Sequence, residues 1–186
     1  MSLTPRLEIG DIEQLTGIPS DRLRYVLNEP ILDGQEKMLS DDARRGRGKA
    51  RRFGPVEAYF VSILALMMQA GLARPTARRA MQRLLEQARI RNADRKAALF
   101  AMLNLYTSAP AVKLQIAEGR YIRITADEGR RRPAAKSAAG ATGNVPIREF
   151  GWLDIDDGTP APTGYEPLAT VTVELGRLAA RLKEGG

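Results

Sequence analysis

The sequence predicts a mainly α winged helix-turn-helix N-terminal domain followed by a small α+β or β-rich C-terminal module. Three observations lead to this fold class. Apolar residues recur at helical spacing through most of residues 8–106, two short helical stripes near the start flank a Gly-containing turn, and alternating apolar runs appear only after residue 110. We therefore expect a winged helix-turn-helix domain over residues 1–107 and a second module over residues 110–186.

Two short helices are predicted first. Residues 8–16 carry an apolar stripe that ends at Gly17, and Ser20 is the expected N-cap of a second helix over residues 21–28. Two short helices joined by a tight turn are typical of the helix-turn-helix, whose second helix enters the major groove of DNA. A small αα-corner in a helical bundle would give the same pattern.

A basic segment follows the second helix. Residues 31–52 are polar, and six of the last nine are cationic, namely Arg44, Arg45, Arg47, Lys49, Arg51 and Arg52. A charge run of this kind is usually a solvated tail, but here it lies between two helical segments. We therefore interpret residues 44–52 as a wing that contacts phosphates or reaches into the minor groove.

Three further helices complete the predicted first domain. Residues 55–70 are apolar around much of a helix, which should form the centre of the domain core. A second helix is expected to begin at Pro75 and to keep its arginines in water. Residues 94–106 continue the helical pattern. The arginines in question are Arg74, Arg78, Arg79 and Arg83.

The C-terminal part is predicted to consist mainly of strands. A hairpin that turns at Glu118-Gly119 is predicted for residues 112–124, and a flexible loop is predicted for residues 127–144. Two more strands are expected at residues 152–155 and 169–173, followed by a closing helix at residues 175–182. The aromatic residues Trp152, Tyr121, Phe150 and Tyr165 either pack in a core or line a ligand pocket.

Composition narrows the possible functions. The chain has no cysteine and no histidine, which argues against thiol and imidazole catalysis and against the usual transition-metal sites. We expect no enzyme activity, no catalytic residues, no metal and no cofactor. The net charge is +7, and residues 1–91 hold 16 Lys/Arg against 11 Asp/Glu, a surplus that favours a polyanionic partner. Neither a signal peptide nor a membrane span is expected, so we predict a cytoplasmic protein.

One family resemblance supports the helix-turn-helix interpretation. Thr16-Gly17-Ile18 followed by Leu23-Arg24-Tyr25 resembles the opening of MerR-type transcriptional regulators, and Arg52-Phe53 and Gly71 also fall at matching places. The similarity covers about residues 7–90. Val26 replaces the usual second aromatic, the basic segment is longer and richer in arginine, and the family's long dimerising helix and cysteine-bearing effector loop are missing.

The resemblance implies a DNA-binding transcriptional regulator that binds double-stranded DNA as a homodimer, with RNA polymerase as a further partner and the nucleoid as its location. The expected DNA-binding residues are Ser20, Asp21, Arg22, Arg24, Tyr25, Arg44, Arg45, Arg47, Lys49, Arg51 and Arg52. Two of them have a plainer interpretation, because Arg24 could pair with Asp21 or Glu29 and Tyr25 could pack on the wing.

Two other functions fit the same residues. An excisionase-like or architectural protein of a mobile element would use the same fold to bend DNA. A ligand-sensing protein would add a C-terminal effector domain to the DNA-binding half. The sequence hardly separates the first of these from a regulator.

Overall fold

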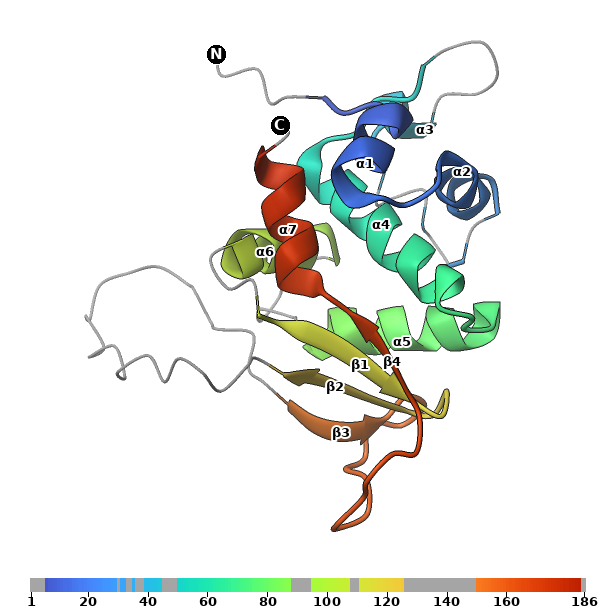
Figure 1. The fold of residues 1–186 in the computed structure, drawn as a ribbon, viewed down its shortest axis with the longest axis vertical. Coiled ribbons are helices and arrows are strands. Elements are labelled where there is room, and N and C mark those ends of the chain that lie inside the picture. The colour runs from blue at the N-terminus through green and yellow to red at the C-terminus, as the bar shows by residue number, and fades with distance from the viewer. Residues whose placement is uncertain are drawn as a thin grey trace, which may run out of the picture.

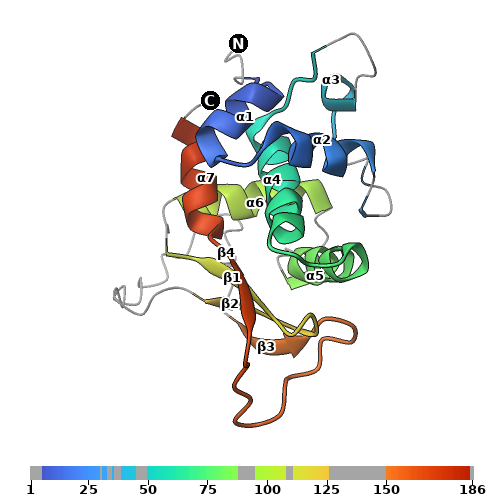
Figure 2. The ribbon, with the colours of Figure 1, turned by 45° about the vertical axis from the view of Figure 1, so that its right-hand side comes forward.

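The computed structural model describes residues 6–29, 31–32, 35, 39–44, 50–87, 95–107, 111–125 and 150–184. Within them the elements are α1 (Ile9–Thr16), α2 (Ser20–Asn28), α3 (Asp41–Arg44), α4 (Pro55–Gln69), α5 (Arg74–Gln87), α6 (Arg95–Thr107), β1 (Lys113–Ala117), β2 (Tyr121–Thr125), β3 (Phe150–Asp154), β4 (Thr170–Val173) and α7 (Leu175–Glu184). Figures 1 and 2 show most helices at one end of the molecule and the sheet at the other, with α5 alongside the sheet. The expected mixed α+β fold with a helical N-terminal half is confirmed. The expected flexible loop at residues 127–144 lies outside the described residues.

The first two helices form where the sequence indicates, with one correction. Gly17 ends α1 in the left-handed conformation, at φ 73°, which favours glycine. Ser20 is not the N-cap of α2. The Pro19 carbonyl accepts the first backbone hydrogen bonds of that helix, and the Ser20 hydroxyl donates to the Glu13 carboxylate instead. The turn therefore spans Gly17–Pro19, and Ser20 fastens the start of α2 to α1.

The stretch between α2 and α4 is less exposed than its polar composition suggests. Ile31, Leu32 and Leu39 are buried, and so is Gln35. The Gln35 amide oxygen accepts from the Ile31 and Leu32 amides at 2.9 and 3.3 Å, and its Nε2 donates to the Val26 carbonyl at 2.8 Å. A buried polar side chain with all these partners gives the turn after α2 a fixed shape. The interpretation of residues 31–52 as one polar stretch is therefore wrong for its first part.

One hydrophobic core connects the two predicted units. The central helix α4 is buried along nearly its whole length, and α7 packs against α1, α4 and α6. Leu175, Leu178 and Leu182 of α7 belong to the same buried cluster as Tyr59 of α4, and the Tyr59 hydroxyl donates to the Leu175 carbonyl at 3.3 Å. Figure 1 shows α7 beside α1. The proposed division between residues 107 and 110 therefore crosses a shared core.

The sheet is antiparallel, in the order β3-β2-β1-β4. Three residues connect β1 to β2, and Glu118 and Gly119 turn the chain with φ 53° and 67°, while the Arg120 amide donates to the Ala117 carbonyl at 2.9 Å. The predicted hairpin, the two later strands and the closing helix are thus confirmed. Trp152 lies outside the helical core. It is half-buried beneath Arg123, whose Cζ lies 4.2 Å from the ring centroid, and it meets the Tyr165 ring edge-on.

Candidate nucleic-acid interface

The outward face of α2 is polar and exposed. Leu23 and Val26 are fully buried against the core and fix the orientation of the helix. The residues that face away from the core are Asp21, Arg22, Arg24, Tyr25 and Asn28. Tyr25 is 39% exposed and is one of the few large aromatic or aliphatic side chains of the described residues to be so exposed. The face combines two cations, a carboxylate, an amide and an aromatic hydroxyl, all of which can bind phosphate or base edges.

Arg24 has a partner in the free protein. Its Nη1 lies 3.1 Å from Asp21 Oδ1, and both side chains are well exposed. This is the plainer interpretation that the sequence left open. An exposed pair of this kind contributes little stability, about 0–1 kcal/mol, so a phosphate or guanine can replace Asp21 at small cost. Glu29, the other candidate partner, lies 3.7 Å from Arg74 at the start of α5.

The end of the basic segment is fixed beside α2. Phe53 is fully buried and exchanges two backbone hydrogen bonds with Leu7, at 2.8 and 2.9 Å. One residue earlier, the Arg52 amide donates to the Asp42 carbonyl at 3.2 Å, and its guanidinium lies 3.7 Å from Glu8. One residue earlier still, Arg51 Nη2 donates to Asn28 Oδ1 at 2.8 Å. Arg51 and Arg52 are therefore held close to both helices of the α1–α2 pair.

The remaining basic residues are placed only in part. Arg44 is the last residue of α3, and Arg45, Arg47 and Lys49 lie outside the described residues. Asn28 was not among the residues predicted to bind DNA. Its signal was available, because Asn28 stands seven residues after Asp21 and four after Arg24 and so falls on the same helical face.

A hollow lies at the start of α4, beside Arg52. It measures about 270 Å³ and is lined by Arg6, Ser40, Arg52, Gly54, Pro55, Val56 and Glu57. The Glu57 carboxylate is buried and accepts from the Ser40 and Gly54 amides at 2.6 and 2.8 Å. Because these backbone donors already hold it, Glu57 ties the residues before α3 to the start of α4 and is a structural group.

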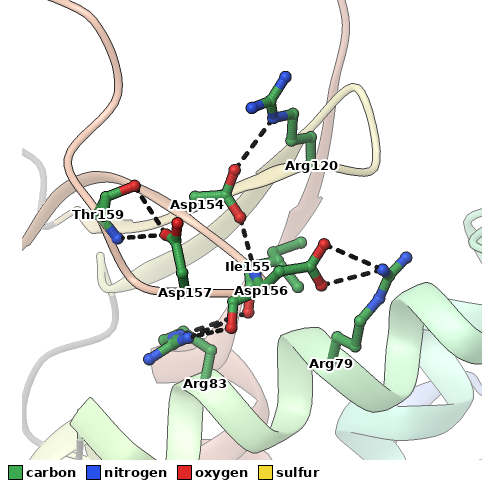
Figure 3. Close-up of polar contacts among 8 residues, drawn as sticks. All are labelled: Arg79, Arg83, Arg120, Asp154, Ile155, Asp156, Asp157 and Thr159. Atoms are coloured by element: carbon green, nitrogen blue, oxygen red, sulfur yellow. Dashed lines mark hydrogen bonds and ion pairs between the residues drawn. The ribbon is translucent and has the colours of Figure 1, made fainter.

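A second polar cluster joins α5 to the loop after β3. Arg79 binds both oxygens of Asp156 through Nη1, at 2.9 and 3.2 Å, and Arg83 Nη2 donates to the Asp156 and Ile155 carbonyls at 2.8 and 3.3 Å (Figure 3). The Arg83 side chain is only 14% exposed. The expectation that the arginines of α5 stay in water is therefore wrong for Arg83, because the loop carbonyls reach it from more than 70 residues away in the sequence. Arg79 is exposed, as expected, although it pairs with Asp156.

The loop itself is held by carboxylates. Asp154 accepts from the Asp156 amide at 2.8 Å and from Arg120 at 3.0 Å, and these contacts, the backbone one first, lower the pKa of Asp154. The Thr159 amide and hydroxyl likewise lower the pKa of Asp157. A carboxylate with a lowered folded-state pKa adds stability above its unfolded pKa, and this stability is lost as the pH falls through the folded value. The α5–loop cluster therefore weakens in acid.

Removing Arg83 should destabilise the protein more than removing Arg79. Arg83→Ala leaves the Ile155 and Asp156 carbonyls without their donor, and we expect a loss of about 1–3 kcal/mol in the free energy of unfolding. Arg79→Ala removes an exposed ion pair and should cost less than about 1 kcal/mol. Urea unfolding of both variants measures the difference. Equal losses would mean that the carbonyl contacts of Arg83 contribute nothing beyond charge pairing.

Comparisons with known proteins add no relative. No protein-family model, no curated protein and no solved structure matches the chain. In the part of the chain that the structure describes, no helix is long and apolar enough to cross a membrane, and no group of three potential metal ligands comes together. The candidate interface therefore rests on its own geometry.

Proposed function

We propose that the protein is a DNA-binding transcriptional regulator that docks α2 in the major groove and sets the basic segment against the backbone or minor groove. One observation carries this proposal. The polar face of α2 and the fixed end of the basic segment lie side by side, joined by Arg51 and Asn28, and both are accessible. A helix that inserts into a groove with cations at its flank is the arrangement that a winged helix-turn-helix uses on DNA.

The resemblance of residues 7–90 to MerR-type regulators supports the same assignment, and the net charge of +7 suits a polyanion. Binding as a homodimer is part of the proposal, because paired half-sites raise affinity and specificity together. The exposed α2 face is compatible with an architectural DNA-binding protein as well, so the test has to separate the two.

Selection from a random duplex library tests the proposal. The purified full-length chain is incubated with the library at several salt concentrations, and the bound duplexes are recovered and sequenced. We expect enrichment of a defined sequence arranged as two half-sites. Binding without enrichment, together with DNA bending, would favour the architectural function. Failure to retain any duplex at low salt would contradict both.

A further inference from the structure

The face of the sheet that points away from the core carries polar and aromatic side chains. Leu114 and Ile122 belong to the buried core, so the alternate residues of β1 and β2 lie on the opposite, outer face. On that face Gln115 of β1 pairs in register with Arg123 of β2, and Arg123 in turn contacts Trp152 of β3. Three half-buried side chains from three adjacent strands therefore lie in one row.

Arg123 is held by two neutral partners. Its Nε donates to Gln115 Oε1 at 2.7 Å, and its Cζ lies 4.2 Å from the centroid of the Trp152 ring. Within the described residues Arg123 forms no ion pair, and its hydrogen bond uses Nε, which leaves both Nη atoms for a ligand. Arg120, at the end of the same face, differs because Asp154 lies 3.0 Å from it and opposes its charge. The row thus presents an uncompensated positive charge on an aromatic ring.

The Trp152 ring is supported from the side. Tyr165, in the connection between β3 and β4, meets it edge-on with 5.8 Å between the ring centroids. Tyr165 also packs on Tyr121 of β2, at 4.5 Å between centroids. Aromatic pairs in these arrangements stabilise one another, so the ring that carries Arg123 has a fixed orientation.

We propose that this row, here called the sheet platform (Gln115, Arg123 and Trp152), binds single-stranded nucleic acid. The inference goes beyond the duplex-binding function and does not depend on it. Bases of a single strand stack on aromatic rings and on guanidinium planes, while arginine donors bind the backbone phosphates. A duplex keeps its bases stacked inside and is read by elements that enter its grooves, which a flat sheet face does not do. An acidic peptide would match the charge but offers the ring no base to stack.

The fluorescence of Trp152 tests where a single strand binds. Trp152 is the only tryptophan of the chain, so its emission reports on the sheet platform. The full-length protein is titrated with labelled oligo(dT) and oligo(rU) of about 12 nucleotides, and both label anisotropy and tryptophan emission are recorded. We expect emission to decrease as bases stack, and to saturate at the same concentration as the anisotropy. The tighter oligonucleotide identifies DNA or RNA as the ligand.

Two substitutions and their matched controls test the residues. Arg123→Ala should lower affinity about tenfold and reduce the salt slope by roughly 0.7, the value for one phosphate contact on a single strand. Arg181→Ala removes the same charge from the exposed side of α7 and should change affinity by less than about twofold. Trp152→Leu should lower affinity at least about fivefold, whereas Trp152→Phe keeps a stacking ring and should stay within about threefold of the wild type.

Four results would overturn the inference. These are no binding of either oligonucleotide, anisotropy changes without any change in Trp152 emission, equal affinities of Arg123→Ala and Arg181→Ala, and binding of an oligoglutamate of the same length as tightly as the oligonucleotides. Urea unfolding checks that each variant is folded. If Trp152→Leu does not fold, the arginine pair and the wild-type emission still decide. A wild type that binds single strands but no duplex contradicts the proposed function only, and the reverse result contradicts this inference only.

Discussion

A chain that ends at residue 107 is expected to lack a cooperative unfolding transition. Truncation there removes α7, which packs on α1, α4 and α6 and completes the cluster around Tyr59. The exposed apolar surface that remains on α4 should leave the fragment loosely packed, with weak near-ultraviolet circular dichroism and a broad thermal transition. A sharp transition close to that of the full chain would show that residues 1–107 fold independently, as the sequence pattern first indicated.

A single substitution in α7 makes the same test without truncation. Leu182 is fully buried, and Leu182→Ala should lower the free energy of unfolding by about 2–5 kcal/mol. Arg181 is its exposed neighbour on the same helix, and Arg181→Ala should change that free energy by less than about 0.5 kcal/mol. Urea denaturation of the two variants gives the comparison, and similar small effects would contradict a core that includes α7.

Arg24 and the Arg51–Arg52 pair should affect DNA binding in different ways. Arg24→Ala removes a side chain from the centre of the α2 face, so we expect a loss of about 1–3 kcal/mol on the selected duplex and much less on random DNA. Replacing Arg51 and Arg52 together should weaken both duplexes alike and lower the salt slope by about one for each lost phosphate contact.

The control for these variants is Arg177→Ala. Arg177 is exposed on α7, outside the candidate interface, and its removal costs the same unit of charge. Its affinity should stay near that of the wild type at physiological salt, because charges beyond about one Debye length are screened. Equal losses for Arg177→Ala and Arg24→Ala on the selected duplex would mean that only net charge matters.

Local patterns in the sequence were enough to predict most elements. Gly17, Pro55 and Gly119 act through their own backbone preferences, so the end of α1, the start of α4 and the β1–β2 turn could be predicted from a few neighbouring residues. The buried stripe of α2 follows from helical spacing in the same way, and it also determines which residues of that helix face outward.

Contacts between distant residues could not be predicted in this way. In the sequence, Arg83 has the pattern of an exposed helical arginine. In the structure it donates to the carbonyls of Ile155 and Asp156, which lie in the loop after β3. Leu175 and Leu182 look like the stripe of a small closing helix, and only the folded chain shows that α1 and α4 form its partner surface. The hydrogen bond from Arg51 to Asn28 likewise joins residues that no local pattern connects.

The most direct test of the central claim is site-specific crosslinking to DNA. Because the chain has no cysteine, a single introduced thiol carries a photo-crosslinker to one position. We predict that Arg22→Cys, on the exposed face of α2, crosslinks to the selected duplex, and that Thr172→Cys, exposed on strand β4 of the sheet, does not. Crosslinking through Thr172→Cys but not through Arg22→Cys would contradict the assignment of α2 as the DNA-contacting helix.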